Sequence, residues 1–194
     1  MSARTQAMRN QFLSCLLITL SLVPPSSQAT DRTAVQSHYL SYHKAGKAVV
    51  AMALTKRVDV KEVEKQVDVM VADAAWIAGE YGRAFPEGGK LLKVVVDHVK
   101  AMRGMSFKEL EHEWHDLHYF DAADRDIGLD LKAEDNEHFT DPIHAIVHPL
   151  MVLDAARRYA ASHGEEELKS IKEEMEEGLE QMEKQSSRLL KKKD

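Results

Sequence analysis

The sequence predicts an all-α protein, an antiparallel helical bundle of about four core helices with an additional long amphipathic helix at the C-terminus. Apolar residues recur at steps of three and four almost throughout the chain. Alternating strand-like runs are nearly absent, and capping residues precede several of the apolar stripes. The length beyond residue 29 suits one domain with its own hydrophobic core.

Residues 1–29 have the pattern of a secretory signal peptide. Two arginines give a positive start, residues 12–23 form an apolar run, and the small residues that end at Ala29 suit cleavage there. The apolar run is too short to span a bilayer comfortably, and no later segment resembles a membrane helix. We therefore expect a periplasmic or secreted protein with no membrane span.

Charge and cysteine content exclude several classes of function. Removal of residues 1–29 takes away two of the 26 basic residues and none of the 32 acidic ones, so the net charge moves from −6 to −8. This acidic balance argues against a nucleic-acid partner. The single cysteine, Cys15, lies in the removed segment, so the exported chain has no disulfide and no thiol for covalent c-type haem.

The first two helices follow from unbroken apolar stripes. The first is predicted over residues 33–57, where apolar positions alternate steps of four and three. The second begins at Asp59, and Glu62 completes an Asp-x-x-Glu capping pattern. Turn-forming residues at 85–89 end the second helix.

A third helix carries apolar residues from Leu91 to Met102 and is interrupted near Gly104. Ser106 and Glu109 then form a capping-box pattern, which indicates either a kink or the start of a new helix. The segment that follows, up to residue 124, holds three histidines within seven positions.

The next helix lies beyond an acidic connector. Asp141 is predicted to cap it, with Pro142 at its first position, and Gly164 is the expected stop. Its residues are apolar on nearly every side, which is typical of a buried helix. Pro149 cannot donate to the carbonyl of Ala145, so we expect a bend and a carbonyl free to bind a side chain or water.

Residues 165–194 predict a densely charged amphipathic helix with a thin apolar stripe. Its acids come first and its lysines last, which suits the helix dipole. Three arrangements fit this pattern: docking on the edge of the bundle, a homo-oligomeric coiled coil with a second copy, or a solvated outer helix. The expected organisation is a signal peptide at 1–29, a bundle at 30–164 and this helix at 165–194.

The histidines give the one candidate site. Six of the ten lie between positions 112 and 148. Helical residues at i, i+4 and i+7 share a face, and two stripes of potential metal ligands have this spacing. They are Glu111, His115 and His118 on one helix, and His144, His148 and Met151 on the next.

If the two stripes face each other, they form a transition-metal site. The expected ligands are Glu111, His115, His118, His144 and His148. Imidazole suits zinc, copper and iron, and a methionine sulfur would favour copper. The corresponding function is metal storage, delivery or sensing.

Two alternatives remain open at this point. Histidines at helix boundaries often hydrogen-bond a carboxylate or carbonyl without a metal, and the protein would then be an envelope interaction module such as a scaffold, chaperone or sensor domain. An enzyme with a catalytic metal is the other alternative, although the sequence shows no complete catalytic set, phosphate loop or nucleophile elbow.

Overall fold

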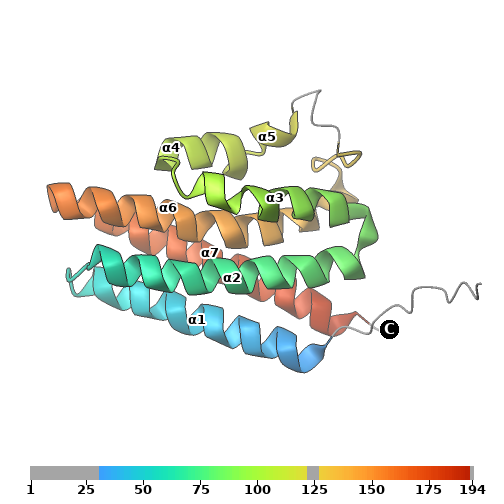
Figure 1. Cartoon of the computed structure of the whole chain (residues 1–194), viewed down its shortest axis with the longest axis horizontal. Coiled ribbons are helices and arrows are strands. Elements are labelled where there is room, and N and C mark those ends of the chain that lie inside the picture. The colour runs from blue at the N-terminus through green and yellow to red at the C-terminus, as the bar shows by residue number, and fades with distance from the viewer. Residues whose placement is uncertain (1–30, 122–126, 193–194) are drawn as a thin grey trace, which may run out of the picture.

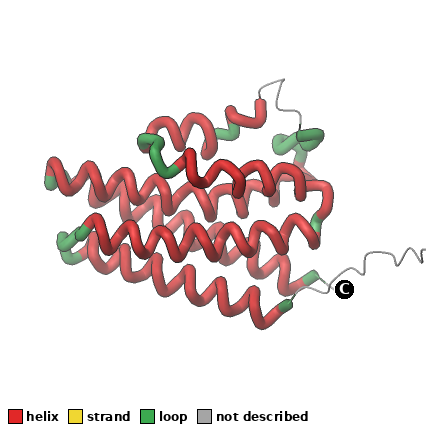
Figure 2. Tube along the Cα trace, in the orientation of Figure 1, coloured by secondary structure: helices red, strands yellow, loops and turns green. Residues whose placement is uncertain are grey.

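The computed structural model describes residues 31–121 and 127–192, so the predicted signal peptide lies outside the described residues. Every regular element in these two ranges is helical, which confirms the predicted all-α class (Figure 2). Among the described helices, none combines the length and the apolar character that crossing a bilayer requires.

Four long helices form the bundle, and each runs antiparallel to its neighbours (Figure 1). α1 packs on α2 and α7, and α6 packs on the same two helices, which closes a four-membered ring around the core. The helices are α1 (Arg32–Leu54), α2 (Val60–Ala84), α6 (Thr140–Ser162) and α7 (Glu165–Lys191).

Side-chain caps begin the helices where the sequence places them. The Asp59 carboxylate accepts hydrogen bonds from the backbone N–H groups of Lys61 and Glu62 at the start of α2. Ser106 and Glu109 form a reciprocal capping box, so the interruption near Gly104 is the start of a new helix.

Shorter elements cover one face of the bundle (Figure 1). After the 3₁₀ turn η1 (Pro86–Gly88), α3 (Gly89–Met102) returns along α2 and also touches α6. α4 (Phe107–Leu110) continues into the π-helical turn η2 (Glu111–His115), and both contact α6 before α5 (His118–Asp121).

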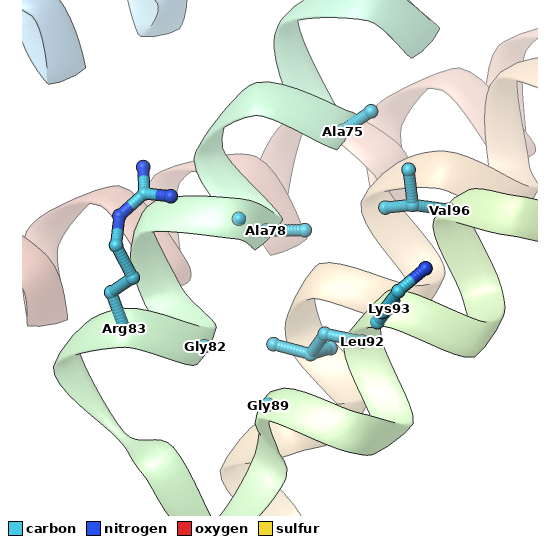
Figure 3. A pocket seen from close by; sticks show the side chains of 9 residues that line it. Ala75, Ala78, Gly82, Arg83, Gly89, Leu92, Lys93 and Val96 are labelled. Atoms are coloured by element: carbon cyan, nitrogen blue, oxygen red, sulfur yellow. The ribbon is translucent and has the colours of Figure 1, made fainter. Parts of the chain in front are cut away.

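Two glycines bring α2 and α3 together. A Cβ on Gly89 would lie 3.2 Å from the carbonyl oxygen of Gly82, so the backbones meet where neither residue has a side chain. Figure 3 shows the groove beside this contact, where Ala78 of α2 faces Leu92 of α3. The small residues of α2 thus let α3 lie close along the bundle.

The start of α6 differs from the sequence prediction. The 3₁₀ turn η4 (Glu134–Phe139) runs directly into the helix at Thr140, so the prediction that Asp141 is the cap was wrong. Asp141 instead lies in the first turn, buried, and accepts a 2.9 Å hydrogen bond from Arg188 of α7. At the other end His163 adopts a left-handed conformation, and Gly164 is already the N-cap of α7.

α7 is a full member of the core rather than a solvated outer helix. Its contact with α6 is the most extensive between any two elements described. Because its thin apolar stripe is buried within the chain, that stripe is not available to pair with a second copy. The buried positions are Leu168, Ile171, Met175, Gly178, Met182, Gln185, Ser186 and Leu189.

Candidate metal centre

Two histidines of the candidate centre lie one turn apart on α6. His144 and His148 are separated by four residues, so both point from the same face of the helix. His148 is 1 % exposed and His144 is partly buried. A buried imidazole needs partners for its ring nitrogens, so this face of α6 must be matched by polar groups from its neighbours.

The third histidine reaches the same place through the π-helical turn η2. The backbone N–H of Asp116 donates to the carbonyl of Glu111 at 2.8 Å, an i to i+5 bond that widens the turn by one residue. Leu117 follows with a φ of 64°, which stops the helix. His115, the last residue of the wide turn, lies against α6.

The three imidazoles converge. One ring nitrogen from each of His115, His144 and His148 lies within 4.8 Å of the corresponding nitrogens of the other two. The rings of His115 and His144 stack with centroids 4.5 Å apart, and the His148 ring meets them edge-on at 5.1 and 5.5 Å. Three nitrogen donors at this separation can surround one small ion after side-chain adjustment.

Only one of the two ring nitrogens of His148 has a hydrogen-bond partner. Its Nδ1–H donates to Oε2 of Glu174 on α7 at 2.8 Å. Its Nε2 is buried and has no hydrogen-bond partner among the described residues. A histidine that ligates a metal through one nitrogen usually donates the other N–H to a carboxylate, and His148 has this arrangement.

His144 and His115 are tethered in the same way. The Nε2–H of His144 donates to the backbone carbonyl of His115 at 3.2 Å, which leaves the lone pair on Nδ1. The Nδ1 of His115 lies 3.3 Å from a carboxylate oxygen of Asp116. Each ring therefore has one nitrogen held by an oxygen acceptor and a second nitrogen that can bind a ligand.

Burial keeps His144 neutral at ordinary pH. Desolvation, and then the proximity of the other two imidazoles, lowers the pKa of His144 to about 4. Because only the neutral imidazole can ligate a metal, this residue needs no deprotonation near pH 7.

The structure does not place Glu111 or His118 with the three ligand atoms that converge, although the sequence pattern predicts both as ligands. Glu111 is exposed, and the His118 ring lies tilted against the His112 ring, with the ring centroids 4.6 Å apart. Met151 is 2 % exposed within the hydrophobic core. For His118 the reason is local: the i, i+4, i+7 rule assumes an unbroken α-helix, whereas the wide turn and the left-handed Leu117 change the direction of the side chains that follow His115 in this segment.

Sequence reasoning missed the two acidic residues that face His148. Glu174 bonds its Nδ1, and Oε2 of Glu177 lies 3.7 Å from its Nε2. α7 contains many glutamates, so composition does not single out these two. Their one available signal is Gly178: a Cβ there would lie 3.1 Å from the Cβ of His148, so this glycine marks a position where α7 lies close to α6.

A polar cleft between η4 and α7 leads to His144. Glu137 and two other acids stand on the η4 side, and Lys184 and Arg188 stand on the α7 side. Of the three clustered histidines, His144 lines this cleft.

Comparisons of the chain with protein-family models, with curated proteins and with solved structures find no match. The candidate function therefore depends on the residues and geometry described above.

Proposed function

We propose that this protein binds a transition-metal ion through His115, His144 and His148, for storage, delivery or sensing. The observation that carries the proposal is the convergence of three imidazoles from two separate segments, with ligand atoms within 4.8 Å of one another. Unliganded, such a cluster sets three potential positive charges side by side, which is unfavourable unless the rings remain neutral.

The donor set fits a metal of intermediate softness. Three neutral imidazoles suit zinc and copper(II), and also iron(II). The unpartnered Nε2 of His148 supports this interpretation, because a buried polar atom without a partner costs free energy that a bound ion would recover.

The arrangement supports binding and exchange rather than a defined reaction. Three protein ligands leave a position that a fourth group or a water can take. The cleft beside His144 is lined mostly by polar and charged residues, and among them Arg188 is already paired with Asp141. Storage, delivery and sensing all need reversible access of an ion.

The proposed site of action is the periplasm or the extracellular space, because residues 1–29 have the pattern of a signal peptide. Expression of the full chain, followed by N-terminal sequencing of the exported product, is expected to show a new N-terminus directly after Ala29. Retention of the full chain in the cytoplasm would contradict this part of the proposal.

Titration of the purified chain lacking residues 1–29 tests the metal proposal. Zinc, copper(II), copper(I) and iron(II) are added in competition with chelators of known affinity. We expect at least one ion to bind tighter than about micromolar, a free energy of about −8 kcal/mol. His115→Ala and His148→Ala are expected to lose this binding.

His118→Ala is the matched control, since His118 lies on the same segment but outside the cluster. Binding weaker than micromolar for all four ions, or unchanged binding in His148→Ala, would overturn the proposal. The histidines would then be structural, as an interaction module without a metal requires.

A further inference from the structure

We propose that Glu177 is the fourth ligand of this centre and that its carboxylate makes the site prefer divalent ions over copper(I). This inference rests on the proposed metal-binding function and adds to it the class of ion. The sequence predicts a carboxylate ligand from Glu111, and the structure offers one from α7 instead.

The distance between the Glu177 carboxylate oxygen and the His148 Nε2 is slightly longer than the separation of two ligand atoms in a tetrahedral metal site. Ligand atoms about 2.0–2.1 Å from a zinc ion lie about 3.3 Å from one another in a tetrahedral site. Oε2 of Glu177 is 3.7 Å from Nε2 of His148, the buried nitrogen with no hydrogen-bond partner. A shift of a few tenths of an ångström brings this oxygen to the expected distance from the His148 nitrogen. The oxygen lies outside the set of three histidine atoms that are within 4.8 Å of one another, so the exposed Glu177 side chain must also turn toward His115 and His144 to complete the site.

The two glutamates that face His148 have different roles. Glu174 is 15 % exposed at its side chain and holds Nδ1, so it positions the ring. Glu177 is 57 % exposed and faces Nε2, so it can reach an ion and can also withdraw from it. Residues three apart lie on the same face of a helix, which is why α7 presents both to one imidazole.

Close packing of the two helices makes this reach possible. Gly178 follows Glu177 directly, and a Cβ at that position would lie 3.1 Å from the Cβ of His148. Without a side chain at residue 178 the α7 backbone lies against α6, so the short glutamate side chain spans the remaining gap.

A carboxylate changes which ions the site holds. Oxygen is a hard ligand that binds divalent ions well, whereas copper(I) prefers sulfur ligands. The anionic oxygen also offsets part of the charge of a divalent ion that three neutral imidazoles leave uncompensated. Zinc and copper(II) are therefore the expected occupants, and copper(I) is expected to bind less tightly.

Three proteins test the role of Glu177: the wild-type chain, Glu177→Gln and Glu176→Gln. Glu176 is exposed at the neighbouring position of α7, whereas the acids that face His148 are Glu174 and Glu177, so the Glu176 variant makes the same charge change away from the site. Zinc and copper(I) affinities are measured for each, and the visible spectrum of bound cobalt(II) reports the ligand set.

We expect Glu177→Gln to weaken zinc binding about tenfold or more, to alter the cobalt spectrum and to leave copper(I) affinity nearly unchanged. Glu176→Gln is expected to match the wild type. Wild-type zinc affinity and an unchanged cobalt spectrum in Glu177→Gln would overturn the role of Glu177 and leave the three-histidine centre in place. Failure of the wild type to bind any ion would instead overturn both proposals.

Discussion

The Tyr42 hydroxyl of α1 donates a 2.9 Å hydrogen bond to the backbone carbonyl of Ala145 in the second turn of α6. This carbonyl has no helical partner, because Pro149 lacks the N–H that would bond it. The prediction that a side chain or water takes this carbonyl is therefore confirmed. Tyr42 is fully buried, and desolvation raises the pKa of its phenol well above the usual value.

Tyr42→Phe is expected to destabilise the protein by about 1–3 kcal/mol, because it leaves the buried Ala145 carbonyl without a donor. Tyr159→Phe is the matched control, since its hydroxyl makes only a 3.4 Å contact with the Lys56 carbonyl. Urea denaturation followed by circular dichroism measures both. Equal decreases in the free energy of unfolding of the two variants would show that the hydrogen bond to Ala145 does not stabilise the protein more than the contact of Tyr159 does.

Gly178→Ala is expected to lower both stability and metal affinity. The added Cβ would lie 3.0 Å from the Tyr42 hydroxyl and 3.1 Å from the His148 Cβ, and neither neighbour can move without breaking its own contacts. Overpacking of this kind costs about 1–3 kcal/mol. The displacement of α7 from His148 is expected to weaken zinc binding as well.

Gly79→Ala on α2 is the control for this substitution. A Cβ at residue 79 meets nothing within 4 Å, so only the helix propensity changes and the protein is expected to gain about 0.5–1 kcal/mol. Denaturation curves that move in the same direction for the two variants would contradict the close approach at Gly178.

The metal-free protein is expected to lose stability as the pH falls from 7 to 4. The pKa of His144 is about 4 in the folded protein, against about 6.5 when unfolded, so the unfolded state binds more protons between these values. Its contribution to the loss reaches up to about 3 kcal/mol at pH 4. The positively charged or chargeable groups that contribute to lowering the pKa of His144 are His115, His148 and Lys184.

His144→Gln isolates this contribution. Burial also lowers the pKa of His138, so the wild-type pH dependence contains more than one histidine. Chemical denaturation at several pH values, with a chelator present, is expected to show a shallower pH dependence in the variant. An identical dependence in both proteins would contradict the low pKa of His144.

Arg188→Met is expected to destabilise the end of the bundle. The Arg188 guanidinium donates to Asp141 at 2.9 Å and to the Tyr81 hydroxyl at 3.0 Å, and both partners are buried. The loss of hydrogen bonds to a charged group costs about 1.5–3 kcal/mol. Burial already raises the pKa of Asp141, and removal of Arg188 raises it further.

The deficit of Arg188→Met is expected to shrink as the pH falls, because protonation of Asp141 removes its uncompensated charge. Thermal denaturation at pH 7 and pH 4.5 checks this. A deficit that is the same at both values would show that Asp141 is not the group left unpaired.

Local sequence determines much of this fold. Helical periodicity, the capping residues Asp59 and Ser106, and the effect of Pro149 on Ala145 all depend on residues within a few positions of each other. The pairing of His144 with His148 is also local, since a spacing of four places both on one face of α6. Such features can be predicted because a helix is built from contacts between near neighbours.

The tertiary structure, rather than the local sequence, determines which helix faces contact each other. The wide turn η2 and the left-handed Leu117 brought His115 to α6 and turned His118 away, although the two histidines are only three residues apart. Packing of α7 between α6 and α1 brings Glu174 and Glu177 to His148, and apart from the nearby Gly178 nothing in the sequence distinguishes them from the other glutamates of that helix. Short-range periodicity specifies the faces of each helix, whereas the contact between faces depends on how the whole core fills its volume.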